Sequence, residues 1–306
     1  MRLGLFYFWS PSLSAMNKDN IFDLPFMDNV AFPILIGVFA FFALLEFFIV
    51  LRPWKAKRLP RWVHNALLSI TGLPLARFLL LPVTVYSAYY FGQHNIGILN
   101  WVQLPVWLEW TLGLLVLDYA IYIWHRLNHR VPFLWRFHNV HHADTEMDIS
   151  TAIRFHFGEL LMSIPFRLIV IAISGVSPMM LLLFEVIFES ATLFHHSNIK
   201  LPKWLEGGLV RFIVTPRMHG IHHSIVKDET DSNYSTVLNW WDRLHGTKRL
   251  DVKQENIIIG VPAYRENADN KFWMLLIHPF KKQREWKLRN GTIPERREEE
   301  KEEVFR

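Results

Sequence analysis

The first two thirds of the chain alternate long apolar runs with short polar segments. The clearest run covers residues 30–51 and contains one charged residue, Glu46. A helix that spans the hydrocarbon core of a bilayer needs roughly 20 mainly apolar residues, so this run predicts a membrane span. Four further runs predict spans too, although each carries one or two ionisable residues: 66–91, 106–124, 157–176 and 178 to about 194.

The composition agrees with a protein that lies in lipid. Of the 306 residues, 51% are hydrophobic and 15% are aromatic, which is high for a soluble protein. We therefore expect an all-α fold, a multi-pass membrane helix bundle of about four to five spans with a cytoplasmic helical cap. The expected divisions are an N-terminal segment (1–29), the membrane domain with its cap (30–280) and a charged tail (281–306), whose run "ERREEEKEEVFR" favours a solvated helix or a frayed end.

The loop charges predict how the bundle is oriented. The segment after the first span contains no acid and carries Arg52, Lys55, Lys57, Arg58 and Arg61, whereas "GQHNIGILNWVQLP" before the third span has no Lys or Arg. By the positive-inside rule the first of these loops is cytoplasmic. Counting the spans forward then places every histidine cluster on the cytoplasmic side. The net charge of +5 suits a protein beside an anionic membrane, and without a recognisable motif nucleic acid is not an expected partner.

Histidines gather in closely spaced boxes. Eleven of the fifteen histidines fall between residues 125 and 223, in "HRLNH", "HNVHH", "RFHFGE", "FHHSN" and "HGIHH". Positions i, i+3 and i+4 share one face of a helix. A box therefore presents two or three imidazoles on one side, which is how a helix offers a metal site.

Acidic residues stand in register with two of the boxes. Two stripes at i, i+4, i+7 and i+11 are Asp118, Tyr122, His125 and His129 in the third span, and Glu185, Glu189, Thr192 and His196 in the fifth. An acid inside a span needs a partner, and a hydrogen bond to an imidazole N–H would supply one and fix the tautomer. The second stripe favours His196 over His195 as a ligand. His156 and Glu159 are also three apart, and Arg154 could pair with that carboxylate.

The number of imidazoles predicts two metal ions. Divalent metals bound by imidazole take four to six ligands, and nine or ten nitrogens are too many for one ion. The chain has no cysteine, so any ligand must be an imidazole or an oxygen. Imidazole accepts zinc, copper, iron and nickel alike. The sequence lacks HExxH and ExxH, which argues against a zincin protease and against a ferritin-like carboxylate centre.

The order of the boxes resembles that of a known superfamily. HxxxH, HxxHH, FxHxN and HxxHH, followed by "ETDSNY" and "WWDRLHGT", are similar to the fatty acid hydroxylase / sterol desaturase superfamily of membrane di-iron oxygenases. The resemblance covers roughly residues 110 to 250. It implies a non-haem centre of two iron ions, replaceable by zinc on heterologous expression, that uses two electrons and O2 to remove hydrogen from a lipid C–H bond. Hydroxylation and desaturation are both outcomes of that chemistry.

The resemblance also implies site residues and partners. The matching ligand positions are His125, His129, His138, His141, His142, His196, His219, His222 and His223. His156 is a further candidate ligand, in a position where many members have R-x-H-P-x-E and this chain has Phe157. We expect Asp118, Glu159 and Glu189 to be catalytic residues that support the centre. The lipid would enter from the bilayer, and a separate donor (cytochrome b5-like, a ferredoxin or a reductase) would supply electrons, since no nucleotide, haem or iron–sulfur signature is visible.

Two other functions are compatible with a histidine-rich protein. A metal transporter would place ionisable residues near the midplane of several spans, ideally in repeated broken helices, whereas these histidines cluster at one boundary and no repeat is seen. A non-redox dimetal hydrolase generally mixes carboxylate ligands with histidine.

Overall fold

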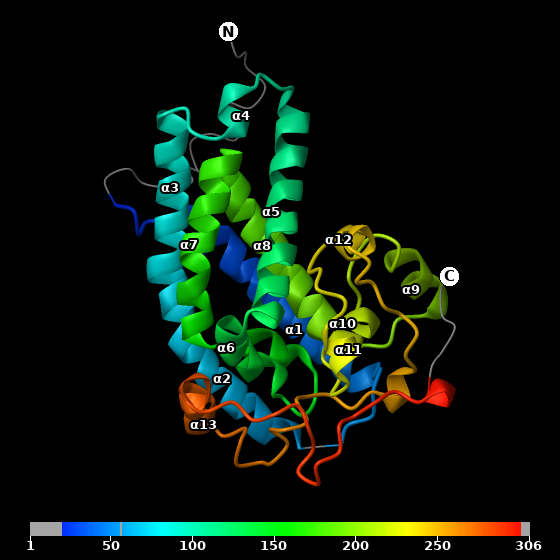
Figure 1. The fold of residues 1–306 in the computed structure, drawn as a ribbon. Helices are drawn as coiled ribbons and strands as arrows, with labels where there is room; N and C mark the ends of the chain where they lie inside the picture. Colours follow the sequence, from blue (N-terminus) through cyan, green and yellow to red (C-terminus); the bar gives the residue numbers. More distant parts are fainter. Residues whose placement is uncertain (1–19, 56, 301–306) are drawn as a thin grey trace.

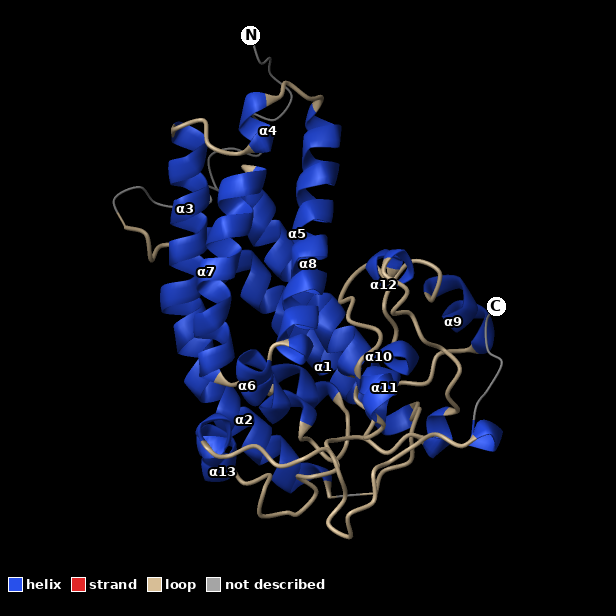
Figure 2. Ribbon diagram, in the orientation of Figure 1, coloured by secondary structure: helices blue, strands red, loops and turns tan. Residues whose placement is uncertain are grey.

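The computed structural model describes residues 20–55 and 57–300. The predictions for residues 1–19 and 301–306, which make up most of the N-terminal segment and the end of the charged tail, lie outside these residues. Within the described ranges the fold is almost entirely helical (Figures 1 and 2) and has no strand, only three isolated β-bridges. The expected all-α class is confirmed.

Among the described residues, five helical stretches are long and apolar enough to cross a membrane, in agreement with a multi-pass integral membrane protein. In chain order they are η2 with α1 (Met27–Phe48), the α2–α4 stretch (Arg58–Trp101), α5 (Val106–Arg130), α7 (Phe157–Ser174) and α8 (Pro178–His196). Helix α3 contacts α7 and α8, α5 contacts α7 and α8, and α1 packs on α8. Figure 1 shows this bundle as the elongated upper part of the molecule, with α4 near its far end.

The second stretch is 44 residues long, about twice what a bilayer requires. It consists of helix α2 (Arg58–Leu75), a π-helical segment (Ala76–Leu80), α3 (Leu81–Gln93) and α4 (Ile98–Trp101). Pro74 and Pro82 flank the π-helical segment, and a proline removes a backbone donor from the helical ladder. The expected span at 66–91 lies within this stretch. Helix α2 begins before that span and contacts η4 and α13 of the cap.

Helices α5 and α8 extend past the expected ends of their spans and so carry histidines into the cap. Helix α8 begins with Pro178 at its first position, and the Ser177 hydroxyl accepts a hydrogen bond from the Met180 N–H. Helix α7 ends at Gly175, whose φ of 73° is left-handed and favours glycine. This turn closes the α7–α8 hairpin and brings His196 back to the end of the bundle where α5 arrives.

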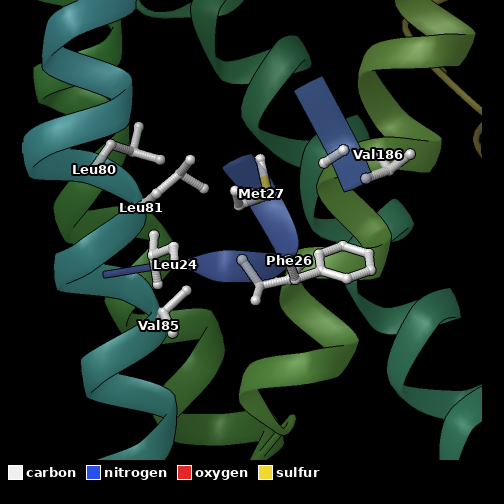
Figure 3. Packing of buried hydrophobic residues seen from close by; sticks show 9 residues of the cluster. Leu24, Phe26, Met27, Leu80, Leu81, Val85 and Val186 are labelled. Atoms are coloured by element: carbon white, nitrogen blue, oxygen red, sulfur yellow. The ribbon is translucent and has the colours of Figure 1, made fainter. Parts of the chain in front are cut away.

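The residues before α1 pack into the bundle. Figure 3 shows side chains of this segment against the second and fifth spans, in a cluster that includes Leu24, Phe26, Met27, Leu80, Leu81, Val85 and Val186. Arg77 adds an ion pair to Asp28, with Nη2 and Oδ2 2.6 Å apart. The segment from Leu24 onward is therefore part of the membrane domain.

The cap consists of short helices at the end of the bundle away from α4 (Figure 1). These are α6 (Pro132–His142), η4 (Ile149–Ile153), α9 (Lys203–Leu209), α10 (Pro216–His222), α11 (Lys227–Thr230), α12 (Trp240–Leu244), η5 (Gln254–Asn256), α13 (Phe272–Ile277), η6 (His278–Phe280) and η7 (Glu298–Glu300). The cap has a small apolar cluster of its own, made by Met147, Ile221, Val252, Ile257 and Ile259.

Buried ion pairs join the first two spans to each other and join the second span to the cap. The Arg61 guanidinium of α2 donates to both carboxylate oxygens of Asp144 at 2.8 and 2.9 Å and to Asp148 at 2.9 Å. Glu46 in α1 pairs with Arg58 at 2.8 Å. Two of the loop cations that predicted the orientation are thus engaged inside the protein.

Within the terminal charge run, the Arg296 side chain is paired inside the protein rather than solvated. Arg296 forms two parallel hydrogen bonds of 2.8 Å to the carboxylate of Glu229 in α11. The Glu229 side chain is fully buried and that of Arg296 is 7% exposed. The expectation of a solvated end therefore does not hold at Arg296, because a buried carboxylate in the cap requires a cation.

Candidate metal centre

Four elements bring nine histidines together where the bundle meets the cap. Helix α5 contacts α6, and α10 contacts α8. Helix α10 is fixed by Pro216 at its first position and by the Thr215 hydroxyl, which accepts from the Met218 N–H. The histidines, in chain order, are His125 and His129 of α5, His138, His141 and His142 of α6, His196 of α8, and His219, His222 and His223 at α10.

The nine rings form two groups. One ring nitrogen from each member lies within 4.8 Å of those of the other members of its group. The first group contains His125, His129, His138, His142 and His222, and the second contains His141, His196, His219 and His223. Eight of these residues are buried and His125 is partly buried. Consecutive residues on α6 and α10 divide between the groups, because successive side chains on a helix point in different directions.

Oxygen atoms around the groups fix the orientation of five rings. Each of these rings turns its Nδ1 toward an oxygen. The contacts are His125 to Tyr234 O (2.7 Å), His138 to Glu159 Oε1 (3.0 Å), His141 to Arg154 O (3.3 Å), His196 to Thr192 O (2.8 Å) and His222 to Ser232 O (2.7 Å). A carbonyl oxygen can only accept, so Nδ1 carries the proton in those four rings. Their Nε2 atoms then present lone pairs, as metal ligands do.

These lone pairs point at one another. The Nε2 atoms of His141 and His196 are 3.0 Å apart, and those of His196 and His219 are also 3.0 Å apart. Since His141 and His196 are both protonated on Nδ1, the close approach of their Nε2 atoms requires a positive charge between them. The Nε2 of His222 is buried without a hydrogen-bond partner among the described residues.

The imidazole rings do not readily take up a proton that would supply this charge. Burial lowers the pKa of His141, His142, His219, His222 and His223 well below the usual value, and the neighbouring imidazoles lower it further. Neutral imidazoles that converge in pairs are a suitable donor set for divalent transition metals. The two groups therefore fit two metal ions, one in each.

His156 lies apart from both groups. Its Nδ1 accepts a hydrogen bond of 2.9 Å from Gly158 N at the start of α7, and its Nε2 lies 3.1 Å from Leu276 O. Both ring nitrogens are thus engaged elsewhere. His195 is outside the groups as well, with its Nδ1 3.2 Å from Thr236 O, whereas its neighbour His196 is in the second group.

The three acidic candidates occupy different surroundings. Asp118 accepts from Trp241 Nε1 at 2.8 Å and from Leu238 N at 3.2 Å, and not from an imidazole. Its expected partner is out of reach, because His125 is seven residues and about 10 Å further along α5. Glu159 contacts His138, not the expected Arg154, whose guanidinium donates to Val140 O at 2.8 Å.

A cavity of about 110 Å³ extends from the histidines between the membrane helices. Its walls come mainly from α5, α7 and α8 and include Ile121, Trp124, Leu160 and Phe188. Glu189 lines the same cavity. An apolar space that opens beside a metal-binding cluster and lies between membrane helices can accept part of a lipid.

A model of the family described as fatty acid hydroxylase matches residues 110–247. These residues are thus similar to the fatty acid hydroxylase family. All nine grouped histidines lie within the matched segment, as do Asp118, Glu159 and Glu189. The family resemblance expected from the boxes is confirmed.

Several curated lipid hydroxylases are similar to this chain. Ornithine lipid hydroxylase OlsE of Rhizobium tropici is 31% identical over 159 residues, which are 52% of this chain and 47% of the relative. Human alkylglycerol monooxygenase is 26% identical over 214 residues, 66% of this chain and 44% of the relative. Mouse cholesterol 25-hydroxylase is 29% identical over 184 residues, 55% of this chain and 60% of the relative.

The chain spans about half the length of the first two relatives. No solved structure matches it. By name these relatives are lipid hydroxylases or monooxygenases, and iron is the metal that the matched family suggests for the histidine cluster.

Proposed function

We propose that the protein is an O2-dependent di-iron monooxygenase that hydroxylates a C–H bond of a membrane lipid, with desaturation as an alternative outcome at the same centre. The observation that supports this most is the pair of histidine groups whose lone pairs converge beside an apolar cavity between membrane helices. The similarity to three kinds of lipid hydroxylase supports the same reaction class.

The proposed ligands are the nine grouped histidines, five for one ion and four for the other. When bound, two iron ions would supply the capacity to use O2 and two electrons for oxidation of an unactivated C–H bond. The protein orients the rings through their Nδ1 contacts, and Glu159 performs this for His138. The apolar walls of the cavity keep bulk water from the site and hold the lipid chain.

Asp118 acts from a greater distance. It binds Trp241 of α12 through its carboxylate and so ties the cap to α5, one to two turns from the first histidine box. We propose that this contact holds α5, which carries His125, against the cap segment that leads into α12 and contains the carbonyl of Tyr234.

We further propose that the centre faces the cytoplasm and receives its electrons there from a separate protein. The unbroken basic composition of the loop after α1 supports this orientation, since the charge bias acts while the chain inserts. A cytochrome b5-like protein, a ferredoxin or a reductase would serve as donor. The lipid, for which sterols, fatty acyl lipids and ether lipids are the classes proposed, would enter from the bilayer.

The first test is metal analysis of protein purified in mild detergent from iron-supplied cells. We expect close to two metal ions per chain, mostly iron. Because His222 and His223 belong to different groups, His222→Ala and His223→Ala should each lower the content toward one ion per chain. An exposed residue of the cap, Lys271→Ala, serves as the control and should leave the content unchanged.

The second test is oxygen incorporation. The iron-loaded protein is supplied with host membrane lipids, a reduced ferredoxin and ¹⁸O2, and the lipids are examined by mass spectrometry. One labelled oxygen atom in a lipid product, lost in both histidine variants, is the expected result. Turnover that continues without O2 would indicate a hydrolase, and metal content near zero in folded protein would contradict the proposal.

A further inference from the structure

The cavity beside the histidines is not uniformly apolar. Among the residues that line it, Asn128 and Thr192 are buried, with exposed fractions of 1% and 3%. Both atoms of the Asn128 amide and the Thr192 hydroxyl lack a hydrogen-bond partner within the described residues. A buried polar group without a partner destabilises the protein, so such groups next to a cavity indicate a ligand that satisfies them.

Thr192 differs from other hydroxyl residues of the bundle. In a helix a Ser or Thr hydroxyl commonly donates to a carbonyl three or four residues earlier. Thr84 does so to Leu80 O at 2.8 Å, and Ser163, which lines the same cavity, does so to Leu160 O at 2.7 Å. The Thr192 hydroxyl forgoes this bond, which leaves it available to a molecule in the cavity.

Asn128 lines the cavity from α5. It lies between His125 and His129 in the sequence, and Thr192 lies one helical turn before His196 on α8. The two polar side chains therefore line the cavity within about one turn, roughly 5 Å along the axis, of residues in the histidine groups.

The charges nearby favour a particular kind of group. Arg167 and Glu189 line the cavity, and Arg167 is already ion-paired with Glu185. These three residues bear one positive and two negative charges when ionised, so one carboxylate is in excess. An acid in a span is stabilised by a hydrogen-bond donor, and the cavity therefore suits a ligand that donates.

We propose that Asn128, Thr192 and Glu189, which line the same cavity, form a subsite for a hydrogen-bond-donating group of the lipid, a hydroxyl or an amine. The proposal rests on the proposed function, and it sharpens the substrate class. The substrate carries its donor group into the cavity next to the histidines, so the carbon that reacts lies within a few bonds of that group and not far along the hydrocarbon tail.

Binding is measured without turnover, under anaerobic conditions and with no electron donor, so that the result does not depend on oxygenation. The probes are a hexadecyl glycerol ether with free hydroxyls, the same ether with its hydroxyls methylated, and hexadecylamine. We expect the purified protein in lipid nanodiscs to bind at least one donor-bearing lipid about tenfold or more tightly than the methylated ether. Whether the ether or the amine binds more tightly identifies the donor group.

Variants with side chains of similar size test whether Asn128 and Thr192 cause the tighter binding of the donor-bearing lipid. Asn128→Leu and Thr192→Val should each lower it by roughly three- to tenfold, the value of one hydrogen bond, while Thr192→Ser should retain it. Ser163→Ala is the matched control, because that hydroxyl is engaged with its own helix, and it should leave the preference as it is.

Metal content is recorded for every variant, so that damage to the centre is recognised. If Asn128→Leu loses metal, the proposed subsite is tested by Thr192→Val and Thr192→Ser alone. Equal affinity of the unchanged protein for the three lipids would overturn the subsite, and so would a Thr192→Val variant that keeps the full preference. Absence of oxygen incorporation in the earlier test would instead contradict the function and would leave this binding result interpretable.

Discussion

The Nδ1 atom of His138 and the Oε1 atom of Glu159 lie 3.0 Å apart and join α6 to the first turn of α7. The carboxylate orients the ring from outside the group of histidines, and such partners contribute about 10- to 100-fold to metal affinity. We predict that Glu159→Ala lowers metal affinity by a factor in this range, measured by competition with a chelator. Glu295→Ala, at an exposed carboxylate, should have no effect. Unchanged affinity in Glu159→Ala would show that the contact does not position the ring.

His156 provides a second prediction. Since its ring nitrogens contact Gly158 N and Leu276 O, His156→Ala should leave the metal content per chain unchanged. The variant loses the N-cap of α7, which costs about 1 kcal/mol, so its thermal unfolding midpoint should fall. Metal analysis and a thermal melt on the same preparation separate the two effects. A lower metal content would instead make His156 a ligand.

Arg296→Ala should destabilise the cap. It removes the partner of the buried Glu229 carboxylate, and an unpaired buried charge costs about 3–5 kcal/mol. The neighbouring Arg297 is 71% exposed and offers a matched control, because an exposed ion pair contributes only about 0–1 kcal/mol. Denaturant unfolding in detergent measures both variants. Equal stability of the two would indicate that the segment after residue 295 does not support the cap.

The stability of the protein should decrease in acid because of Asp144. Burial acts to raise the pKa of this carboxyl, but the Arg61 guanidinium overcomes it and holds the pKa well below the usual range. A lowered pKa in the folded state means that the stabilisation is fully present above about pH 4, the value in an unfolded chain, and is lost as the pH falls toward the folded value.

We therefore expect the unfolding midpoint to fall below about pH 4 in the unchanged protein. Asp144→Asn should be less stable at neutral pH and should vary less over this acid range. Asp251→Asn, at a half-exposed carboxylate paired with Arg249, is the control and should follow the unchanged protein. If Asp144→Asn shows the same decrease in acid, other carboxyls are responsible.

Helical spacing predicted that the histidines of each box lie near one another, but not how they divide between the two groups. HxxxH and HxxHH place their imidazoles on one face wherever the segment is helical, and α5, α6 and α10 are. The spans were predictable for a similar reason, because length and apolar content decide them. The apolar pattern predicted the membrane bundle, and the histidine boxes predicted a metal site at one end of it.

The contacts that orient the rings could not be predicted. Four of the five Nδ1 partners with oxygen are backbone carbonyls, among them Tyr234 O and Ser232 O. Every residue has a carbonyl, so the sequence carries no signal for its direction. Asp118 and His125 lie on the same face of α5, as predicted, but they are too far apart for a hydrogen bond. The partner of Asp118 is Trp241, which only the tertiary fold brings close.

The division of histidines between groups has a consequence for how the protein is assembled. His222 and His223 are adjacent in the chain, yet each belongs to a different group, together with rings from α5 and α6 in one case and from α6 and α8 in the other. Two bound ions would therefore cross-link segments that lie up to about a hundred residues apart. Metal binding would hold the cap against the membrane helices. A chain that loses one ion should keep its membrane spans, while its cap packs less firmly against them.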